Sequence, residues 1–142
     1  MNEPTQRQFL PTFSELIDRM TVTQIKLNLI ENGKEDFREE LRKISSDLDL
    51  ILAKNPIAFS GDLILTFITI AQLNLHIWHN KDKMQENLKN EEEYLRLLKL
   101  SHQLNGYRNQ LKNDLLRIEG SADKSQLRSN FETDGLSFEI GL

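Results

Sequence analysis

The sequence predicts an all-α protein: a four-helix bundle built from two similar helical hairpins, followed by a flexible C-terminal tail. Three observations support this prediction. Apolar residues recur every three or four positions in four long stretches, capping residues separate those stretches, and one stretch resembles a later one. We expect the bundle to cover residues 1–119, with halves at about 12–54 and 60–119, and the tail to cover residues 120–142.

The first hairpin is marked by local signals at both ends. A helix is expected to begin at Thr12, because a threonine followed three positions later by Glu15 can cap two backbone N–H groups. Asn32–Gly33 ends this helix, since glycine readily takes the left-handed conformation that terminates helices. A second helix should run from about Lys34 to Ala53. Its apolar seam has the spacing of one helical face: Phe37, Leu41, Ile44, Leu48 and Ile51.

The second hairpin follows the same plan. Its first helix is expected from about Ser60 to Gln85, because the apolar run is far longer than an ordinary strand. We predict that the buried seam of this helix is Ile64, Ile68, Ala71, Leu75 and Trp78. The last helix should run from Asn90 to about Glu119, with Glu93 at the capping-box position and Gly120 as its end. Its predicted seam is Leu97, Leu100, Leu104, Tyr107, Leu111, Leu115 and Ile118.

An internal similarity links the two hairpins. Residues 20–32 align without gaps with residues 68–80, and four of the thirteen aligned pairs are identical. Two related hairpins can bury their apolar faces against each other, which predicts a bundle with an approximate twofold axis. Chance similarity between two apolar helices is the competing interpretation, and it also leads to a bundle. The wide apolar stripes on the first and third helices favour a homodimer.

Composition excludes several classes of function. The 142 residues carry a formal charge of −4, which argues against general nucleic-acid binding, because such binding needs a basic surface. The absence of cysteine excludes disulfides, thiolate metal sites and thiol catalysis. The polar N-terminus is unlike a secretory signal, and the apolar run of residues 63–78 is too short and too polar for a membrane span. We therefore expect a cytoplasmic protein with no membrane span.

One candidate ligand cluster lies on the third helix. His76, His79 and Asp82 are spaced to share one side of that helix, and histidines one turn apart can bind a metal. Di-metal sites in helical bundles use Glu-x-x-His pairs with further carboxylates, and the sequence has no such pair. We therefore expect no metal and no cofactor. The simpler interpretation is that these residues mark where the helix leaves the core.

A second candidate group lies on the last helix. Asn105, Arg108, Asn109 and Lys112 form a polar stripe of side chains that suit phosphates or sugar hydroxyls. A solvated helix face explains the same residues. Asp18 follows an apolar pair at the expected rim of the bundle, and a buried Asp18–Arg108 pair would be a structural lock as readily as a site. Because no Gly-rich phosphate loop or serine-nucleophile motif is present, we assign no catalytic residue and lean against an enzyme.

Three short segments carry a resemblance to a known group of proteins. Residues 12–19 (TFSELIDR), 77–84 (IWHNKDKM) and 104–109 (LNGYRN) resemble segments of small bacterial helical proteins encoded among surface-polysaccharide and glycosyltransferase genes. The resemblance covers about half of the chain. In those proteins the residue after Trp-His is commonly acidic or variable, whereas here it is Asn80, followed by Lys81. The resemblance implies a cytoplasmic accessory role and supplies no catalytic residue.

Three functions are compatible with the sequence. The leading hypothesis is a non-enzymatic helical-bundle protein that binds a protein partner or itself, as an accessory factor in cell-envelope polysaccharide synthesis. The alternative is an enzyme or sensor for a sugar nucleotide, with a small-molecule ligand bound by the two candidate groups described above. A third hypothesis, an inhibitor or antitoxin of a larger enzyme, fits the acidic charge equally well.

Overall fold

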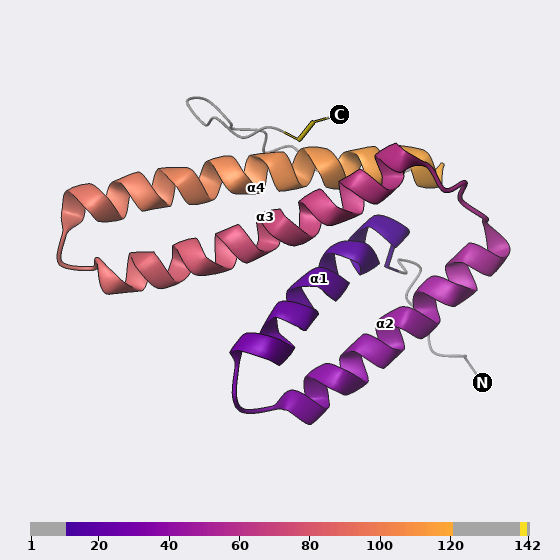
Figure 1. Cartoon of the computed structure of the whole chain (residues 1–142), viewed down its shortest axis with the longest axis horizontal. Helices are drawn as coiled ribbons and strands as arrows, with labels where there is room; N and C mark the ends of the chain where they lie inside the picture. Colours follow the sequence, from indigo (N-terminus) through magenta and orange to yellow (C-terminus); the bar gives the residue numbers. More distant parts are fainter. Residues whose placement is uncertain (1–10, 121–139, 142) are drawn as a thin grey trace, which may run out of the picture.

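The computed structural model describes residues 11–120 and 140–141, and these residues form four α-helices and no strand. The helices are α1 (Phe13–Leu29), α2 (Lys34–Lys54), α3 (Gly61–Glu86) and α4 (Glu91–Glu119) (Figure 1). The all-α prediction is confirmed, and each helix has bounds close to those expected. In the described part of the chain, no helix combines the length and the apolarity needed to cross a bilayer.

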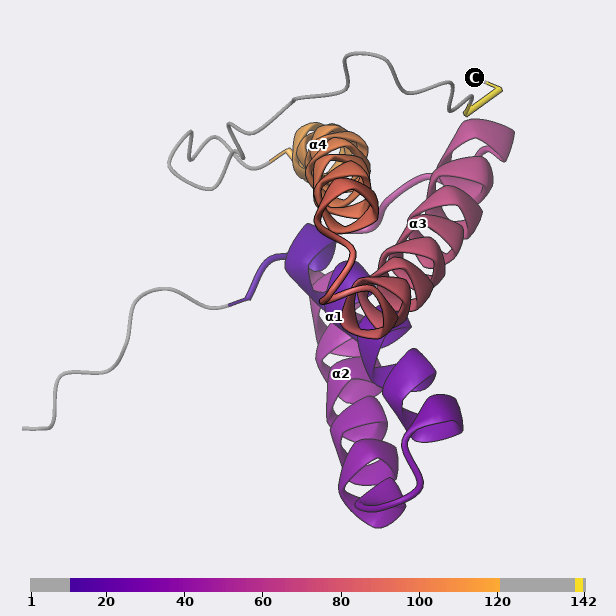
Figure 2. The ribbon, with the colours of Figure 1, turned by 90° about the vertical axis from the view of Figure 1, so that its left-hand side faces the viewer.

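The four helices pair as two antiparallel hairpins, α1–α2 and α3–α4 (Figure 1). Helix α1 is central, because it packs against α3 and α4 as well as α2, whereas α2 packs mainly against α1 (Figure 2). If a twofold axis related the two hairpins, α1 would correspond to α3 and α2 to α4. Helix α2 would then pack against α3 in the same way that α1 packs against α4. The helix contacts do not show this arrangement, so the internal repeat stays a prediction.

Local capping explains where the helices begin. Thr12, Ser60 and Asn90 each accept a hydrogen bond from the backbone N–H three residues later, at 3.1, 3.1 and 3.2 Å. Such caps satisfy donors that have no partner inside the helix. Gly33 and Gly120 take positive φ angles of 83° and 78°. Gly120 ends α4 as expected, but Gly33 precedes α2 as its N-cap rather than ending α1 directly.

The predicted seam of α3 is wrong. Ile64, Ile68 and Leu75 are 48%, 49% and 40% exposed, and the other two seam residues are half-buried. The buried apolar stripe of α3 lies on an adjacent face and contains Leu63, Thr66, Ile70, Leu73 and Ile77. The reason is that residues 63–80 contain no Asp, Glu, Lys or Arg, so two neighbouring faces of the helix have apolar seams.

The core receives apolar side chains from all four helices. The fully buried ones include Leu16 of α1, Ile44 of α2, Ile70 of α3 and Leu104 of α4. Most residues of the predicted seams of α2 and α4 are buried or pack against this core. Phe37 and Leu41 are only partly buried, and Ile118 is 46% exposed. The predicted flexible tail falls mostly on residues outside the described part of the chain. Within the described part, Ile140 is partly buried and packs against the core.

Candidate functional site

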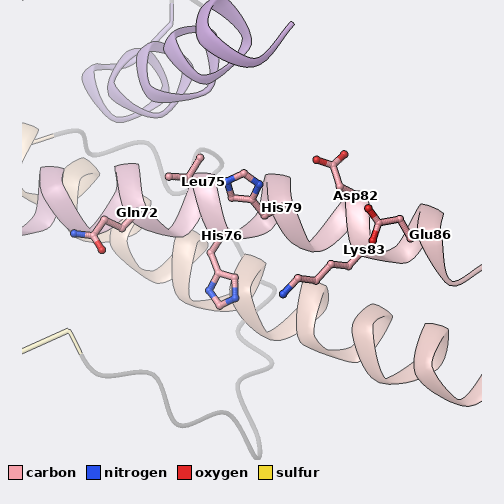
Figure 3. Close-up of a pocket in the computed structure, with 7 residues that line it drawn as sticks. All are labelled: Gln72, Leu75, His76, His79, Asp82, Lys83 and Glu86. Atoms are coloured by element: carbon pink, nitrogen blue, oxygen red, sulfur yellow. The ribbon is translucent and has the colours of Figure 1, made fainter.

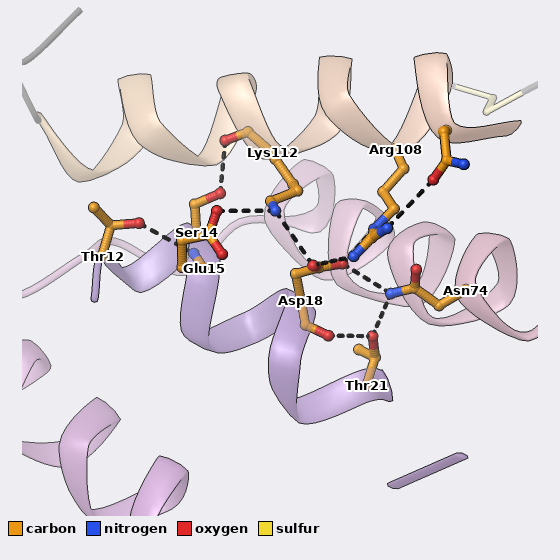
Figure 4. Close-up of polar contacts among 9 residues, drawn as sticks. Thr12, Ser14, Glu15, Asp18, Thr21, Asn74, Arg108 and Lys112 are labelled. Atoms are coloured by element: carbon orange, nitrogen blue, oxygen red, sulfur yellow. Dashed lines mark hydrogen bonds and ion pairs between the residues drawn. The ribbon is translucent and has the colours of Figure 1, made fainter. Parts of the chain in front are cut away.

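The most polar part of the interior lies where α1 crosses the second hairpin. Asp18 of α1 is only 4% exposed, and Arg108 of α4 approaches it with two nitrogen atoms. The Arg108 Nε donates to Asp18 Oδ1 at 2.8 Å and its Nη2 to Oδ2 at 2.5 Å (Figure 4). This fork is the strongest geometry available to an arginine–carboxylate pair. The structure thus contains the inter-helix pair considered from the sequence.

A second cation joins the pair from the next turn of α4. The Lys112 Nζ lies 3.3 Å from Asp18 Oδ2 and 2.9 Å from Glu15 Oε1 (Figure 4). Its side chain is 5% exposed, so its charge is removed from water almost completely. Two carboxylates and two cations therefore face one another, and their formal charges cancel. Such balance is needed, because an uncompensated buried charge is strongly destabilising.

Helix α3 contributes the neutral member of the network. The Asn74 Nδ2 donates to Asp18 Oδ1 at 2.9 Å and to the Thr21 hydroxyl at 2.5 Å. That hydroxyl in turn donates to the Asp18 carbonyl oxygen at 2.8 Å (Figure 4). Asn74 itself is 4% exposed. The network therefore joins three helices, and we call Glu15, Asp18, Thr21, Asn74, Arg108 and Lys112 the crossing network.

The electrostatics keep the Asp18–Arg108 pair charged. Burial by itself would raise the pKa of Asp18, but the hydrogen bonds and charge of Arg108, helped by Lys112 and Asn74, outweigh burial and hold the pKa below its ordinary value of 3.8. Burial would lower the pKa of Arg108, and Asp18 reverses this effect so that the pKa is raised. Within residues 11–120 and 140–141, every buried side-chain nitrogen and oxygen has a hydrogen-bond partner. The buried polar atoms of the crossing network are therefore all hydrogen-bonded.

A second junction joins the ends of three helices. Glu119, the last residue of α4, accepts the backbone N–H of Phe13 at 3.3 Å and that of Ser14 at 3.5 Å. The Asn55 side chain, just after α2, donates to the Glu119 carbonyl oxygen at 2.8 Å. Burial raises the pKa of Glu119, and the two backbone hydrogen bonds only partly oppose it. Glu119 therefore acts as an N-terminal cap for α1, although the two are more than 100 residues apart in the sequence.

A third polar insertion lies inside the second hairpin, between α3 and α4. Asn80 is 2% exposed, and its Nδ2 donates to the Leu97 carbonyl oxygen and the Ser101 hydroxyl, each at 2.8 Å. The Ser101 hydroxyl lies 3.5 Å from the sulfur of Met84. This junction uses no charge.

The predicted histidine cluster lies elsewhere. His76, His79 and Asp82 are exposed and line a shallow groove along α3. His79 and Asp82 lie on the side of α3 that carries Leu75, whereas His76 points away from it (Figure 3). Among the described residues, no group of three or more histidines, cysteines or acidic residues is placed to hold a metal ion.

The two predicted groups do not form one site. Arg108 meets Asp18, but the groove that contains Asp82 is not lined by either of them. Asn105 accepts a hydrogen bond from Arg108 Nη1 at 3.3 Å and so supports the crossing network, while Asn109 is half-buried on α4. Arg108 is thus paired with Asp18 and Asn105, whereas the histidine cluster lies on the surface.

Sequence reasoning missed several members of these junctions, among them Asn74 and Glu119. Asn74 lies four residues after Ile70 and three before Ile77, so it belongs to the stripe that proved to be buried. A polar residue inside a buried stripe needs a partner, and this position was the available signal. Glu119 had no such signal, because the residues that it contacts lie more than 100 positions earlier in the sequence.

Comparisons with protein-family models, curated proteins and solved structures give no match to this chain.

Proposed function

We propose that this chain is a non-enzymatic helical protein that acts by binding a protein through one face of α3. We call Ile64, Ile68, Ala71, Leu75 and Trp78 the outer face of α3. The single observation that carries the proposal is that this face is apolar yet open to solvent, with its three large aliphatic members, Ile64, Ile68 and Leu75, 40–49% exposed. Exposed apolar residues that are contiguous on a surface, rather than scattered, are characteristic of interaction sites.

The crossing network supports the same proposal. Arg108, which was considered as a ligand for phosphates, is bound to Asp18 and Asn105. It orients the two hairpins, which makes the protein a rigid scaffold for the outer face. Residues 12–19, 77–84 and 104–109 resemble segments of proteins encoded among surface-polysaccharide genes. On this basis we propose an accessory role in cell-envelope polysaccharide synthesis.

Affinity capture from a native lysate tests the proposal. We expect the wild-type chain to retain a specific protein, either another copy of itself or a different chain. An Ile68→Asp variant should lose that protein, because the carboxylate would have to be desolvated at the interface. Leu95→Asp is the matched control, since Leu95 is also exposed, at 55%, but lies on α4. Equal retention by the Ile68→Asp variant, or no retention by the wild type, contradicts the proposal.

A thermal-shift screen distinguishes this function from the sugar-nucleotide alternative. Nucleotides, nucleotide sugars and divalent metals should leave the Tm unchanged at saturating concentrations. A true ligand present at 100 times its Kd would raise the free energy of unfolding by about 2.7 kcal/mol, because it binds only the folded state. A stabilisation of that size would favour the alternative.

A further inference from the structure

Helix α4 is buried on more sides than its neighbouring helices explain. Its core seam, which includes Leu104 and Leu111, is packed against α1 and α3, and both of these helices lie on one side of α4 (Figure 2). Gly106 and Asn113 lie on the far side, because each follows a seam residue by two positions in a helix of 3.6 residues per turn. Yet Gly106 is buried, and Asn113 is only 2% exposed. Something other than α1 and α3 therefore covers the far side of α4.

The covered part of this side is short. His102 is exposed, whereas the next residue, Gln103, is only 5% exposed. Leu95 is 55% exposed on the far side before this point, and Arg117 is exposed after Asn113. The loops that join the helices lie at the ends of the two hairpins and not beside the middle of α4 (Figure 1). The cover is therefore a separate segment that crosses α4 between residues 103 and 113.

The chemistry of the covered side suits a peptide backbone. We call Gln103, Gly106, Gln110 and Asn113 the amide face of α4. Its three side chains are uncharged amides, which both donate and accept hydrogen bonds and so match the N–H and C=O groups of an extended chain. Glycine inside a helix is destabilising relative to alanine, but it lets another backbone approach closely. The amide face thus has the properties of a binding surface for an extended peptide.

The C-terminal end of the chain lies close enough to supply that peptide. Ile140 is partly buried and packs against the core, and residues 140–141 lie on the side of the α3–α4 hairpin that is away from α2 (Figures 1 and 2). The chain between Gly120 and Ile140 can span more than about 60 Å when extended. The distance along α4 from Gly120 back to Gln103 is only about 26 Å. A chain that leaves α4 at Gly120 and returns to the core at Ile140 is therefore long enough to cross the amide face.

The sequence of the C-terminal end has the pattern of an extended segment. Leu136, Phe138, Ile140 and Leu142 are apolar, and the residues between them are Ser, Glu and Gly. Apolar residues at every second position lie on one edge of an extended chain, which leaves one edge to pack against the protein. Ile140, which packs against the core, belongs to this edge.

We propose that α4 carries a binding face for an extended peptide, the amide face, and that the C-terminal segment of the same chain, residues 121–142, occupies it and is fixed there by Ile140. This inference goes beyond the proposed function, because it concerns a different helix from the outer face of α3. Either of the two can therefore fail alone.

Single cysteines test whether the segment covers the face, because the chain has no cysteine of its own. Gln103→Cys places a thiol on the amide face, and His102→Cys places the matched control at the exposed neighbouring position. In the full chain, the thiol of Gln103→Cys should react at least about tenfold more slowly, because it is reached only when the segment opens. Each rate is divided by the rate of the same variant unfolded in urea. Equal normalised rates would overturn the inference.

Ile140→Asp identifies the covering segment. Combined with Gln103→Cys, it should raise the rate of thiol modification to that of His102→Cys, because the carboxylate cannot be buried against the core without a partner. The His102→Cys control should not respond, and circular dichroism checks that the helices remain folded. Phe138→Asp together with Ile140→Asp is the second variant. If protection survives in this double variant, another part of the chain covers the face and the inference is wrong.

Gly106→Lys tests the close approach by the sign of its effect. On an open helix surface this change should raise the Tm, because lysine favours helices more than glycine does. Under a covering segment it should lower the Tm and remove the protection of Gln103→Cys, whereas His102→Lys should leave both unchanged. A higher Tm with protection retained would contradict the inference.

Dilution distinguishes the chain's own segment from that of a second copy. A tethered segment has an effective concentration set by its linker, so protection should be unchanged on about a hundredfold dilution. Protection that disappears on dilution would assign the cover to another chain and overturn the inference.

Discussion

Two of the polar insertions in the interior, the crossing network and Asn80, differ in kind. Where the hairpins cross, four charged side chains meet around Asp18, while between α3 and α4 the single amide of Asn80 makes two neutral hydrogen bonds. The α3–α4 pairing is already restricted by the short connection from Glu86 to Glu91. No short loop joins the two hairpins at the point where they cross. Charged contacts there accept only one relative orientation of the hairpins, at the cost of desolvation.

The largest effect is expected from Asp18→Ala. This change leaves Arg108 and Lys112 with Glu15 as the nearest carboxylate, so a buried positive charge is left uncompensated. The free energy of unfolding should fall by about 3–5 kcal/mol in urea titrations. Arg96→Ala removes a fully exposed ion pair on α4, so the free energy of unfolding should stay close to that of the wild type. A loss from Asp18→Ala no larger than that of the control would mean that the crossing does not depend on its charges.

A smaller loss is expected from Asn80→Ala, because no charge is left behind. Removing the amide takes a donor from Ser101 and from the Leu97 carbonyl, which should cost about 1–3 kcal/mol. Hydrogen exchange sharpens the comparison. Asn80→Ala should speed amide exchange mainly in α3 and α4, whereas Asp18→Ala should also speed it in α1. The same exchange pattern for both variants would contradict the distinction between the two insertions.

A still smaller effect is expected at the start of α3, outside both insertions. Ser60→Ala removes the hydroxyl that accepts the Leu63 N–H at 3.1 Å. The expected cost is about 1 kcal/mol, measured by urea unfolding. Ser60→Asp should retain most of the stability, because aspartate also caps helices well. If the alanine and aspartate variants were equally unstable, the cap would not be the cause.

The smallest effect is a pH dependence at Glu119. Its pKa is raised in the folded state by burial, so its contribution to stability is present below the ordinary pKa of 4.5 and is lost as the pH rises through the folded-state pKa. Glu119→Gln does not ionise. The free energy of unfolding of the variant minus that of the wild type should therefore be larger at about pH 7 than at about pH 4. Urea unfolding of both proteins at both pH values measures this difference. The opposite trend would show that the backbone hydrogen bonds outweigh burial.

The helix bounds could be predicted from sequence because their causes are local. Ser60 and Asn90 cap helices by contacting residues three positions away, and Gly120 ends α4 through its own backbone angle. The orientation of α3 could not be predicted in the same way. With no charged residue between Asp62 and Lys81, nothing in the sequence distinguishes the face of Ile70 from that of Ile68.

The candidate site, too, could be predicted from the sequence only in part. Asp18 and Arg108 could be considered as a pair because each is a charge beside an apolar seam of its own helix. The roles of Asn74 and Glu119 depend on how the helices are placed relative to one another. For Asn74, the uncharged stretch of α3 does not indicate which face is buried. For Glu119, nothing in the sequence indicates that the end of α4 contacts the start of α1. The burial of Lys112 follows from the same placement.

The cap that Glu119 provides for α1 brings the first and last helical turns of the bundle into direct hydrogen-bonded contact. The helical part of the chain is therefore almost a closed ring. Circular permutants should be readily accessible: a short linker would join residue 120 to residue 11, and new ends could be opened at the exposed Asn32–Gly33 turn.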